Sequence, residues 1–133
     1  MQVLSQQLIS DEYARLLRED LRSGALVRFL VAYTTDQGLD TIGRTMLLNR
    51  LKHSESFGIA SISCSCGYEA LLNLQSELSD QRLKYFMDPD VGDTCEPFRI
   101  ALLHSKVVYI ADVAREKSIV YVGSHNWTAR ALG

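Results

Sequence analysis

The chain has 133 residues, of which 14 are Lys or Arg and 16 are Asp or Glu, so its formal net charge is −2. Hydrophobic residues make up 47% of the sequence and charged residues 23%, which is typical of one globular domain and excludes disordered and collagen-like chains. No apolar run is long enough for a membrane span, and the N-terminus lacks a signal-peptide pattern. We therefore expect a soluble, cytoplasmic protein with no membrane partner.

The predicted elements begin with a helix and a strand. Apolar residues recur at three- and four-residue steps over 5–22, which predicts an amphipathic helix that stops at Ser23-Gly24. The apolar run 25–33 is rich in β-branched and aromatic residues, as expected of a strand covered on both faces. The segment 34–38 is expected to turn the chain.

Helices and strands continue to alternate after this turn. Two extended segments, 98–110 and 118–122, are expected to pair as a hairpin, and a short helical stretch is expected over 128–132. The whole chain then reads as one domain, 1–133, of the α/β class, with a layered mixed sheet flanked by helices. The elements before the hairpin are helix 39–51, strand 57–64, helix 68–78 and strand 82–87.

Two residues that can carry chemistry stand inside the predicted strand 98–110. His104 and Lys106 are two positions apart, so pleating points both side chains to one face, about 6.6 Å apart along the strand. Their neighbours are apolar, which makes a cation and an imidazole costly here unless they are used or paired. Taken alone, His104 and Lys106 are also compatible with an edge strand that has one solvent-exposed face.

A second polar segment follows the predicted hairpin. Gly123 permits a sharp turn, and Ser124 and Asn126 offer hydrogen-bonding side chains beside the backbone N–H groups of a helix start, where chains commonly bind anions. An ordinary helix N-cap is the alternative interpretation. If the hairpin forms, His104 and Lys106 come to the same side of neighbouring strands as this segment.

Two further side chains in this segment have less specific signals. Trp127 could stack on a base, although an aromatic residue at the start of a terminal helix is more often part of the core or an interface. His125 is expected to point away from Ser124 and Asn126, toward a substrate or the surface.

The run His104-Ser105-Lys106, followed after sixteen residues by Gly123-Ser124-His125-Asn126, resembles the signature of the phospholipase D superfamily. The alternating elements upstream resemble the single-motif domain of that superfamily, so the resemblance covers most of the chain. The stretch 123–133 is especially similar to versions of the motif in small nucleases, restriction enzymes and helicase-associated domains.

The sequence departs from the superfamily pattern in two places. The pattern H-x-K-x4-D would put its acid at Ala111, whereas the aspartate is Asp112, one residue later. That aspartate is generally structural in the superfamily, so the shift bears on the turn after the strand more than on the chemistry. The sequence also stops at Gly133, soon after the second motif, so we expect a C-terminally truncated domain or the N-terminal part of a longer protein.

The resemblance implies a metal-independent phosphodiesterase that needs no cofactor. One histidine, His104, would attack phosphorus and a second would protonate the leaving oxygen, while Lys106, Ser124 and Asn126 hold the non-bridging oxygens. Because the chain has one copy of the motif, the resemblance implies a homodimer with a composite site. The implied substrate is nucleic acid, DNA rather than RNA, in a restriction or defence system.

Two alternatives stay open from the sequence. The first is a non-catalytic phospholipase D-like module that binds nucleic acid or dimerises within a larger helicase or nuclease. The second is phospholipid hydrolysis, which would need a membrane-docking surface, and the sequence contains no basic amphipathic helix to provide one.

Overall fold

The computed structural model describes residues 10–61, 65–86, 106–123 and 125–132. Within these ranges no helix is long and apolar enough to cross a membrane. The described elements are α1 (Ser10–Ser23), β1 (Leu26–Val31), α2 (Asp36–Ile42), α3 (Arg44–Leu51), β2 (Phe57–Ser61), α4 (Ser65–Ser76), β3 (Leu83–Phe86), β4 (Val107–Asp112), β5 (Lys117–Val122) and α5 (Ala129–Leu132).

The strands form one mixed sheet in the order β3-β2-β1-β4-β5. Strands β1, β2 and β3 are mutually parallel, whereas β4 runs antiparallel to both β1 and β5. The predicted α/β class and the predicted hairpin are therefore confirmed, while 98–105 lie outside the described residues. This topology brings the carboxyl ends of β1 and β5 to the same end of the sheet as the start of β4.

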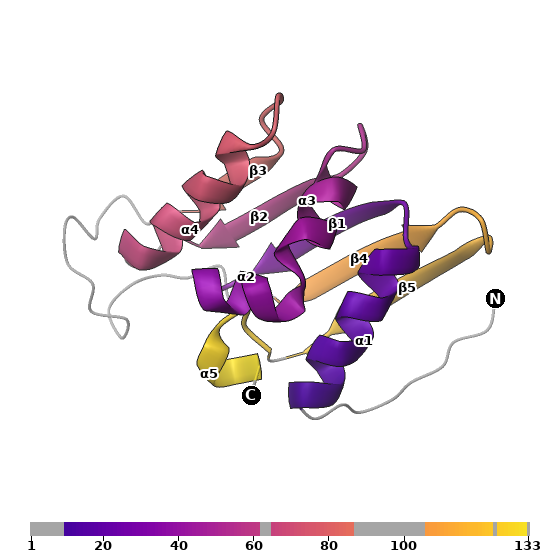
Figure 1. The fold of residues 1–133 in the computed structure, drawn as a ribbon, viewed down its shortest axis with the longest axis horizontal. Helices are drawn as coiled ribbons and strands as arrows, with labels where there is room; N and C mark the ends of the chain where they lie inside the picture. The colour runs from indigo at the N-terminus through magenta and orange to yellow at the C-terminus, as the bar shows by residue number, and fades with distance from the viewer. Residues whose placement is uncertain (1–9, 62–64, 87–105, 124, 133) are drawn as a thin grey trace.

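Helices α1, α3 and α4 lie across one face of the sheet (Figure 1). Val27, Phe29 and Val31 of β1 point toward these helices and are buried, in a core that also contains Leu17 of α1. The intervening residues of β1 are only half-buried, on the opposite face. The expectation that this strand is covered on both faces is therefore wrong, because the described helices all pack on one side.

The predicted helix 39–51 is two helices in the structure. Gly43 has φ of 98°, a left-handed conformation that ends α2 and precedes α3. Helix α2 also begins earlier than expected, inside the predicted turn 34–38. The reason is an N-cap, since the hydroxyl of Thr35 accepts a hydrogen bond from the N–H of Gly38 at 3.1 Å.

Candidate functional site

The two motif segments meet where β4 begins and β5 ends. Lys106 immediately precedes β4 and Gly123 immediately follows β5. The N–H of Gly123 donates to the carbonyl of Lys106 at 3.2 Å, which continues the ladder beyond the Val107–Val122 pair. The sheet thus joins the backbone of the H-x-K segment to that of the G-S-x-N segment; His104 and Ser124 themselves lie outside the described residues.

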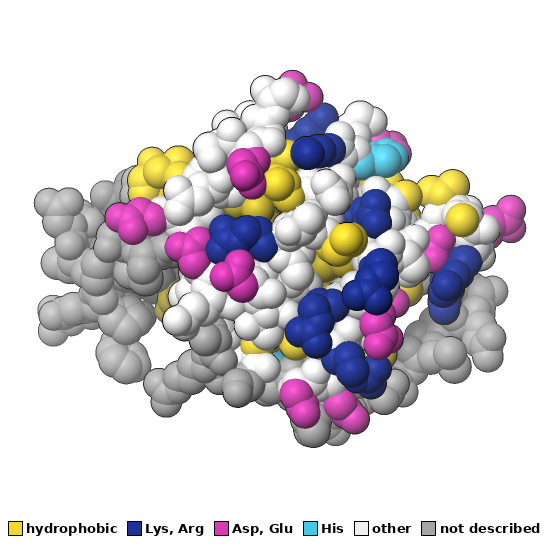
Figure 2. Space-filling model, in the orientation of Figure 1, with side chains coloured by type: hydrophobic (Ala, Val, Ile, Leu, Met, Phe, Trp, Pro, Cys, Tyr) yellow, Lys and Arg dark blue, Asp and Glu magenta, His cyan; other side chains and the backbone are white. Residues whose placement is uncertain are grey.

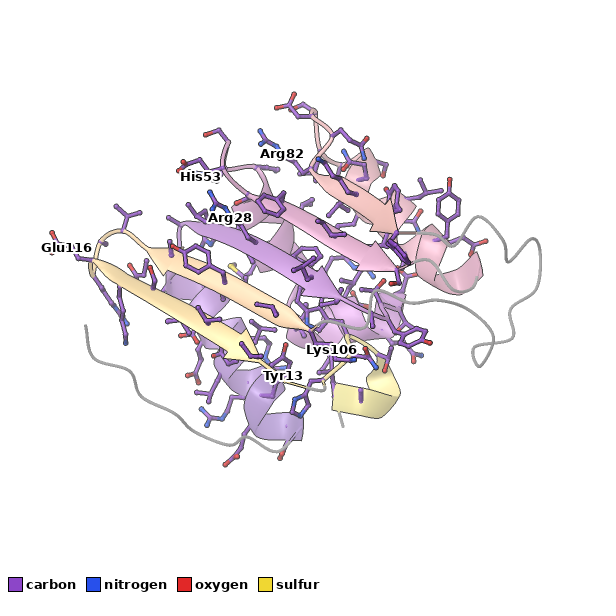
Figure 3. All side chains as sticks on the ribbon, turned by 180° about the vertical axis from the view of Figure 1, so that it is seen from behind. Tyr13, Arg28, His53, Arg82, Lys106 and Glu116 are labelled. Carbon is purple, nitrogen blue, oxygen red and sulfur yellow. The ribbon has the colours of Figure 1, made fainter. Side chains whose placement is uncertain are left out.

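Lys106 is buried, with 8% of its surface exposed. It alternates in phase with Val108 and Ile110, which belong to the core, so it is on the helix-covered side of the sheet. Burial lowers the pKa of its ammonium from the ordinary value, because a charge is less stable away from water. Figure 3 shows Lys106 and Tyr13 at the same end of the molecule.

The second motif is held in place by the chain that follows β1. The N–H of Trp127 donates to the carbonyl of Tyr33, and the N–H of Thr35 donates to the carbonyl of Trp127, both at 2.9 Å. A Cβ atom on Gly38 would lie 1.9 Å from that same carbonyl oxygen, so only glycine permits this approach of α2. The motif segment therefore adds a short parallel bridge at the end of β1.

The aromatic side chains of the second motif pack on α1. Trp127 is fully buried and its indole N–H donates to the hydroxyl of Tyr13 at 3.2 Å, so it belongs to the core. Burial raises the pKa of Tyr13, partly offset by this hydrogen bond. The ring of His125 stacks on that of Tyr13, with centroids 4.5 Å apart. His125 is half-buried and packs on α1 through one ring face, so the expectation that it faces a substrate or the surface stays a prediction.

Asn126 has hydrogen-bonding capacity that the fold does not use. Its Oδ1 atom is buried and has no hydrogen-bond partner within the described part of the chain, and the same is true of the hydroxyl of Thr34. Thr34 bridges to Trp127, so the two unpaired groups belong to adjacent segments at one end of the sheet. Buried polar groups are nearly always paired, so these two exceptions leave hydrogen-bonding capacity at this end of the sheet. A third group that is unpaired within the described ranges, the hydroxyl of Tyr85, lies on β3.

Asp112 stands at the other end of β4, about 20 Å along the strand from Lys106. Its carboxylate is 3% exposed and accepts a hydrogen bond from the backbone N–H of Arg115 at 3.2 Å. The Arg115 side chain approaches the second carboxylate oxygen at 3.5 Å. Asp112 therefore stabilises the hairpin turn and takes no part in the candidate site.

Sequence reasoning missed the residues that support the motif from other elements. Tyr13 occupies an apolar position of α1 and resembles an ordinary core residue, while Thr34 and Gly38 lie in a segment expected only to turn the chain. One chemical signal pointed to a supporting residue, because a buried Trp needs a hydrogen-bond acceptor for its indole N–H. Periodicity could not say which residue provides it.

Two arginines on the helix-covered face have structural partners. Figure 2 shows Lys and Arg side chains gathered over α1. Arg50 donates to the carbonyls of Leu21 and Arg22, at 2.6 and 2.8 Å, and so satisfies the C-terminal end of this helix. Arg18 donates to the carbonyl of Thr41 at 2.7 Å. These arginines hold helices together and are not a free anion site.

No family model matches this chain, and no curated protein matches it. Within the described ranges, no three His, Cys, Asp or Glu side chains are grouped so as to hold a metal ion. An assignment of function therefore rests on the sequence motifs and on the geometry of the described residues.

Proposed function

We propose that this chain is a phospholipase D-like phosphodiesterase that cleaves nucleic acid, DNA in preference to RNA, in a site shared by two copies of the chain. The observation that carries the proposal is the hydrogen bond from Gly123 to the carbonyl of Lys106, which keeps the two motif segments adjacent. They meet beside the carboxyl end of β1, the end of such sheets at which ligands commonly bind.

In the proposed reaction the imidazole of His104 attacks phosphorus, and the bond from phosphorus to the leaving oxygen breaks. The partner subunit's His104, in its protonated form, gives its proton to that oxygen. A water molecule then attacks the phosphohistidine, losing its proton to the same partner imidazole, so that a phosphate monoester leaves and His104 is regenerated. Each cycle consumes one water and needs no oxidant or reductant.

The remaining motif residues would stabilise charge on the non-bridging oxygens. The burial of Lys106 supports this role, because a cation in a site with little water interacts more strongly with the charge that develops in the transition state. Asn126 is included on the strength of the motif and would donate from its Nδ2–H2 group, because its unpaired Oδ1 atom is an acceptor and cannot bind a phosphate oxygen. Ser124 completes the set on the strength of the sequence motif.

The test is cleavage of single-stranded DNA, double-stranded DNA and bis(p-nitrophenyl) phosphate in excess EDTA, which suppresses contaminating metallonucleases. We expect chelator-resistant cleavage by the wild type and a loss of about 1,000-fold or more in the His104→Ala variant. His53→Ala is the matched control, since His53 lies in the turn before β2, where its Nδ1 accepts the N–H of Glu55.

Equal loss of activity in the two histidine variants would contradict the assignment of His104. A folded wild-type dimer that cleaves none of the three substrates would contradict the catalytic proposal. The non-catalytic binding module would then be the better description of the chain.

A further inference from the structure

The face of the sheet opposite the helices carries a row of aromatic and cationic side chains. Arg28 of β1 is in register with Phe57 of β2 on one side and with Tyr109 of β4 on the other. Its guanidinium carbon lies 5.5 Å from the centroid of the Phe57 ring and 6.0 Å from that of Tyr109. Phe57 is 40% exposed, so the row presents ring surface to solvent.

An open groove of about 540 Å³ runs beside this row. Arg28, Phe57, Arg82 and Lys84 contribute to its lining. Figure 3 shows Arg28 and Arg82 together at the end of the sheet away from Lys106. We call Arg28, Phe57, Arg82, Lys84 and Tyr109 the sheet platform.

The platform differs in charge from the acidic molecule around it. Its five residues include three cations and no carboxylate, although the chain as a whole has a net charge of −2. One cation already has structural partners, because Arg82 pairs with the exposed Asp80 at 3.0 Å and donates to the carbonyl of Ser54 at 2.6 Å. Glu55 also lines the groove and accepts a hydrogen bond from Arg28 through its backbone carbonyl. Lys84 is exposed on β3, in register with Ile59 of β2.

We propose that the sheet platform binds single-stranded nucleic acid. Bases stack on exposed aromatic rings and on guanidinium planes whatever their sequence, and nearby lysines and arginines neutralise the phosphates. A row of ring, guanidinium and ring across adjacent strands provides the stacking surface, and the exposed Lys84 beside it provides a cation for the phosphates. The inference deepens the proposed function and rests on it for nucleic acid as the substrate class.

Two other occupants fit this face less well. Duplex DNA hides the faces of its bases and is bound chiefly through its phosphates, which favours a broad basic surface rather than a few cations among aromatic rings. A second copy of the chain, packed face to face, would bring Arg28 and Lys84 of both copies into an interface with little water, where like charges are costly.

The platform is separate from the candidate catalytic site. Tyr109 and Lys106 are three positions apart on the same segment, roughly 10 Å along the strand. They differ in phase, so Lys106 is on the helix-covered side and Tyr109 is on the platform side. A nucleic acid bound on the platform would therefore have to extend past the end of the sheet to reach the catalytic site. Because the two sites are separate, binding to the platform can be measured without cleavage.

The experiment uses fluorescence anisotropy in EDTA, with the non-cleaving His104→Ala protein and two labelled probes. One probe is oligo(dT) of about 20 nucleotides and the other is a DNA hairpin duplex of the same length. We expect oligo(dT) to bind at least about ten-fold more tightly than the duplex. Phe57→Ala should weaken oligo(dT) binding about ten-fold, and Lys84→Gln should reduce the slope of log K against log salt by about 0.7.

Matched controls come from exposed residues outside the platform. Lys117→Gln, at the start of β5, and Val113→Ala, an exposed residue in the turn between β4 and β5, should leave oligo(dT) binding unchanged. Added to the otherwise wild-type protein, the platform substitutions should not change cleavage of bis(p-nitrophenyl) phosphate, which is too small to span both sites. Circular dichroism and thermal melting establish that each variant is folded.

Absence of oligo(dT) binding, or equal losses in the platform and control variants, would overturn the proposal. So would a dimer that Phe57→Ala dissociates, because a second copy would then be the occupant. Oligo(dT) binding by a protein that cleaves nothing would keep the platform and reject the catalytic proposal, so the two failures are distinguishable.

Discussion

Trp127 connects the candidate site to the N-terminal helix through a single polar contact. An indole has one donor, and in this protein the hydroxyl of Tyr13 accepts it in a fully buried setting. Tyr13 also stacks on His125 and makes an edge contact with Tyr121, so one side chain of α1 contacts the second motif and β5. The position of the motif therefore depends on a residue far from it in sequence.

Tyr13→Phe should lower the free energy of unfolding by about 1–3 kcal/mol, because it leaves the buried N–H of Trp127 without an acceptor while keeping the ring. Urea denaturation followed by tryptophan fluorescence measures the change. The control is Tyr109→Phe, whose hydroxyl meets Ser118 in an exposed contact and whose loss should change stability by no more than about 0.5 kcal/mol. Equal midpoints for Tyr13→Phe and the wild type would contradict the buried hydrogen bond.

The elements show how far periodicity predicts this fold. The strands and the hairpin were predictable because their segments are apolar and rich in β-branched and aromatic residues, and because turn residues separate them. The division of 39–51 was not, since Gly43 interrupts a continuous apolar pattern with a backbone angle that the pattern does not record. The bridge between Trp127 and the chain after β1 is a long-range pairing, and no local sequence signal specifies it.

The site was predictable only in part, for the same reason. The sequence motifs indicate Lys106 and Asn126 as candidate residues, and the hairpin brings their segments together. The unpaired hydroxyl of Thr34 could not be foreseen, because it depends on how β1 ends beside Trp127. The stacking of His125 on Tyr13 could not be foreseen either, because Tyr13 belongs to a distant helix.

The break between the helices α2 and α3 gives a prediction about the stability of these elements. A Cβ atom at Gly43 would meet its nearest neighbour, the Cγ of Arg18, at 3.5 Å, which is ordinary contact, so any cost comes from the positive φ. Gly43→Ala should therefore destabilise the protein by about 1–2 kcal/mol. Gly43→Asn should cost less, because asparagine tolerates this conformation. Chemical denaturation of both variants tests the order, and an alanine variant as stable as wild type would contradict it.

At the scale of the whole molecule, the proposed composite site requires two copies of His104 for every reaction. A dimer with one His104→Ala chain would lack either the nucleophile or the acid, and should be inactive. Wild-type protein unfolded and refolded with about nine-fold excess of this variant should keep about a tenth of its activity per wild-type chain. The control is refolding with the same excess of His53→Ala, and light scattering verifies the dimer. Full activity in the His104→Ala mixture would mean that each chain acts alone.

The contacts that close the site also constrain when it can form. Tyr13 and Trp127 are 114 positions apart, and Asp20, which accepts a hydrogen bond from the hydroxyl of Tyr121, is 101 positions from its partner. Contacts of such high sequence separation slow folding, because a long loop must close before they contribute. During synthesis on a ribosome, α1 emerges before the second motif, so Tyr13 and Asp20 at first lack their contact partners. The order of synthesis therefore keeps the site unassembled, and the proposed nuclease inactive, until almost the whole of this domain has emerged.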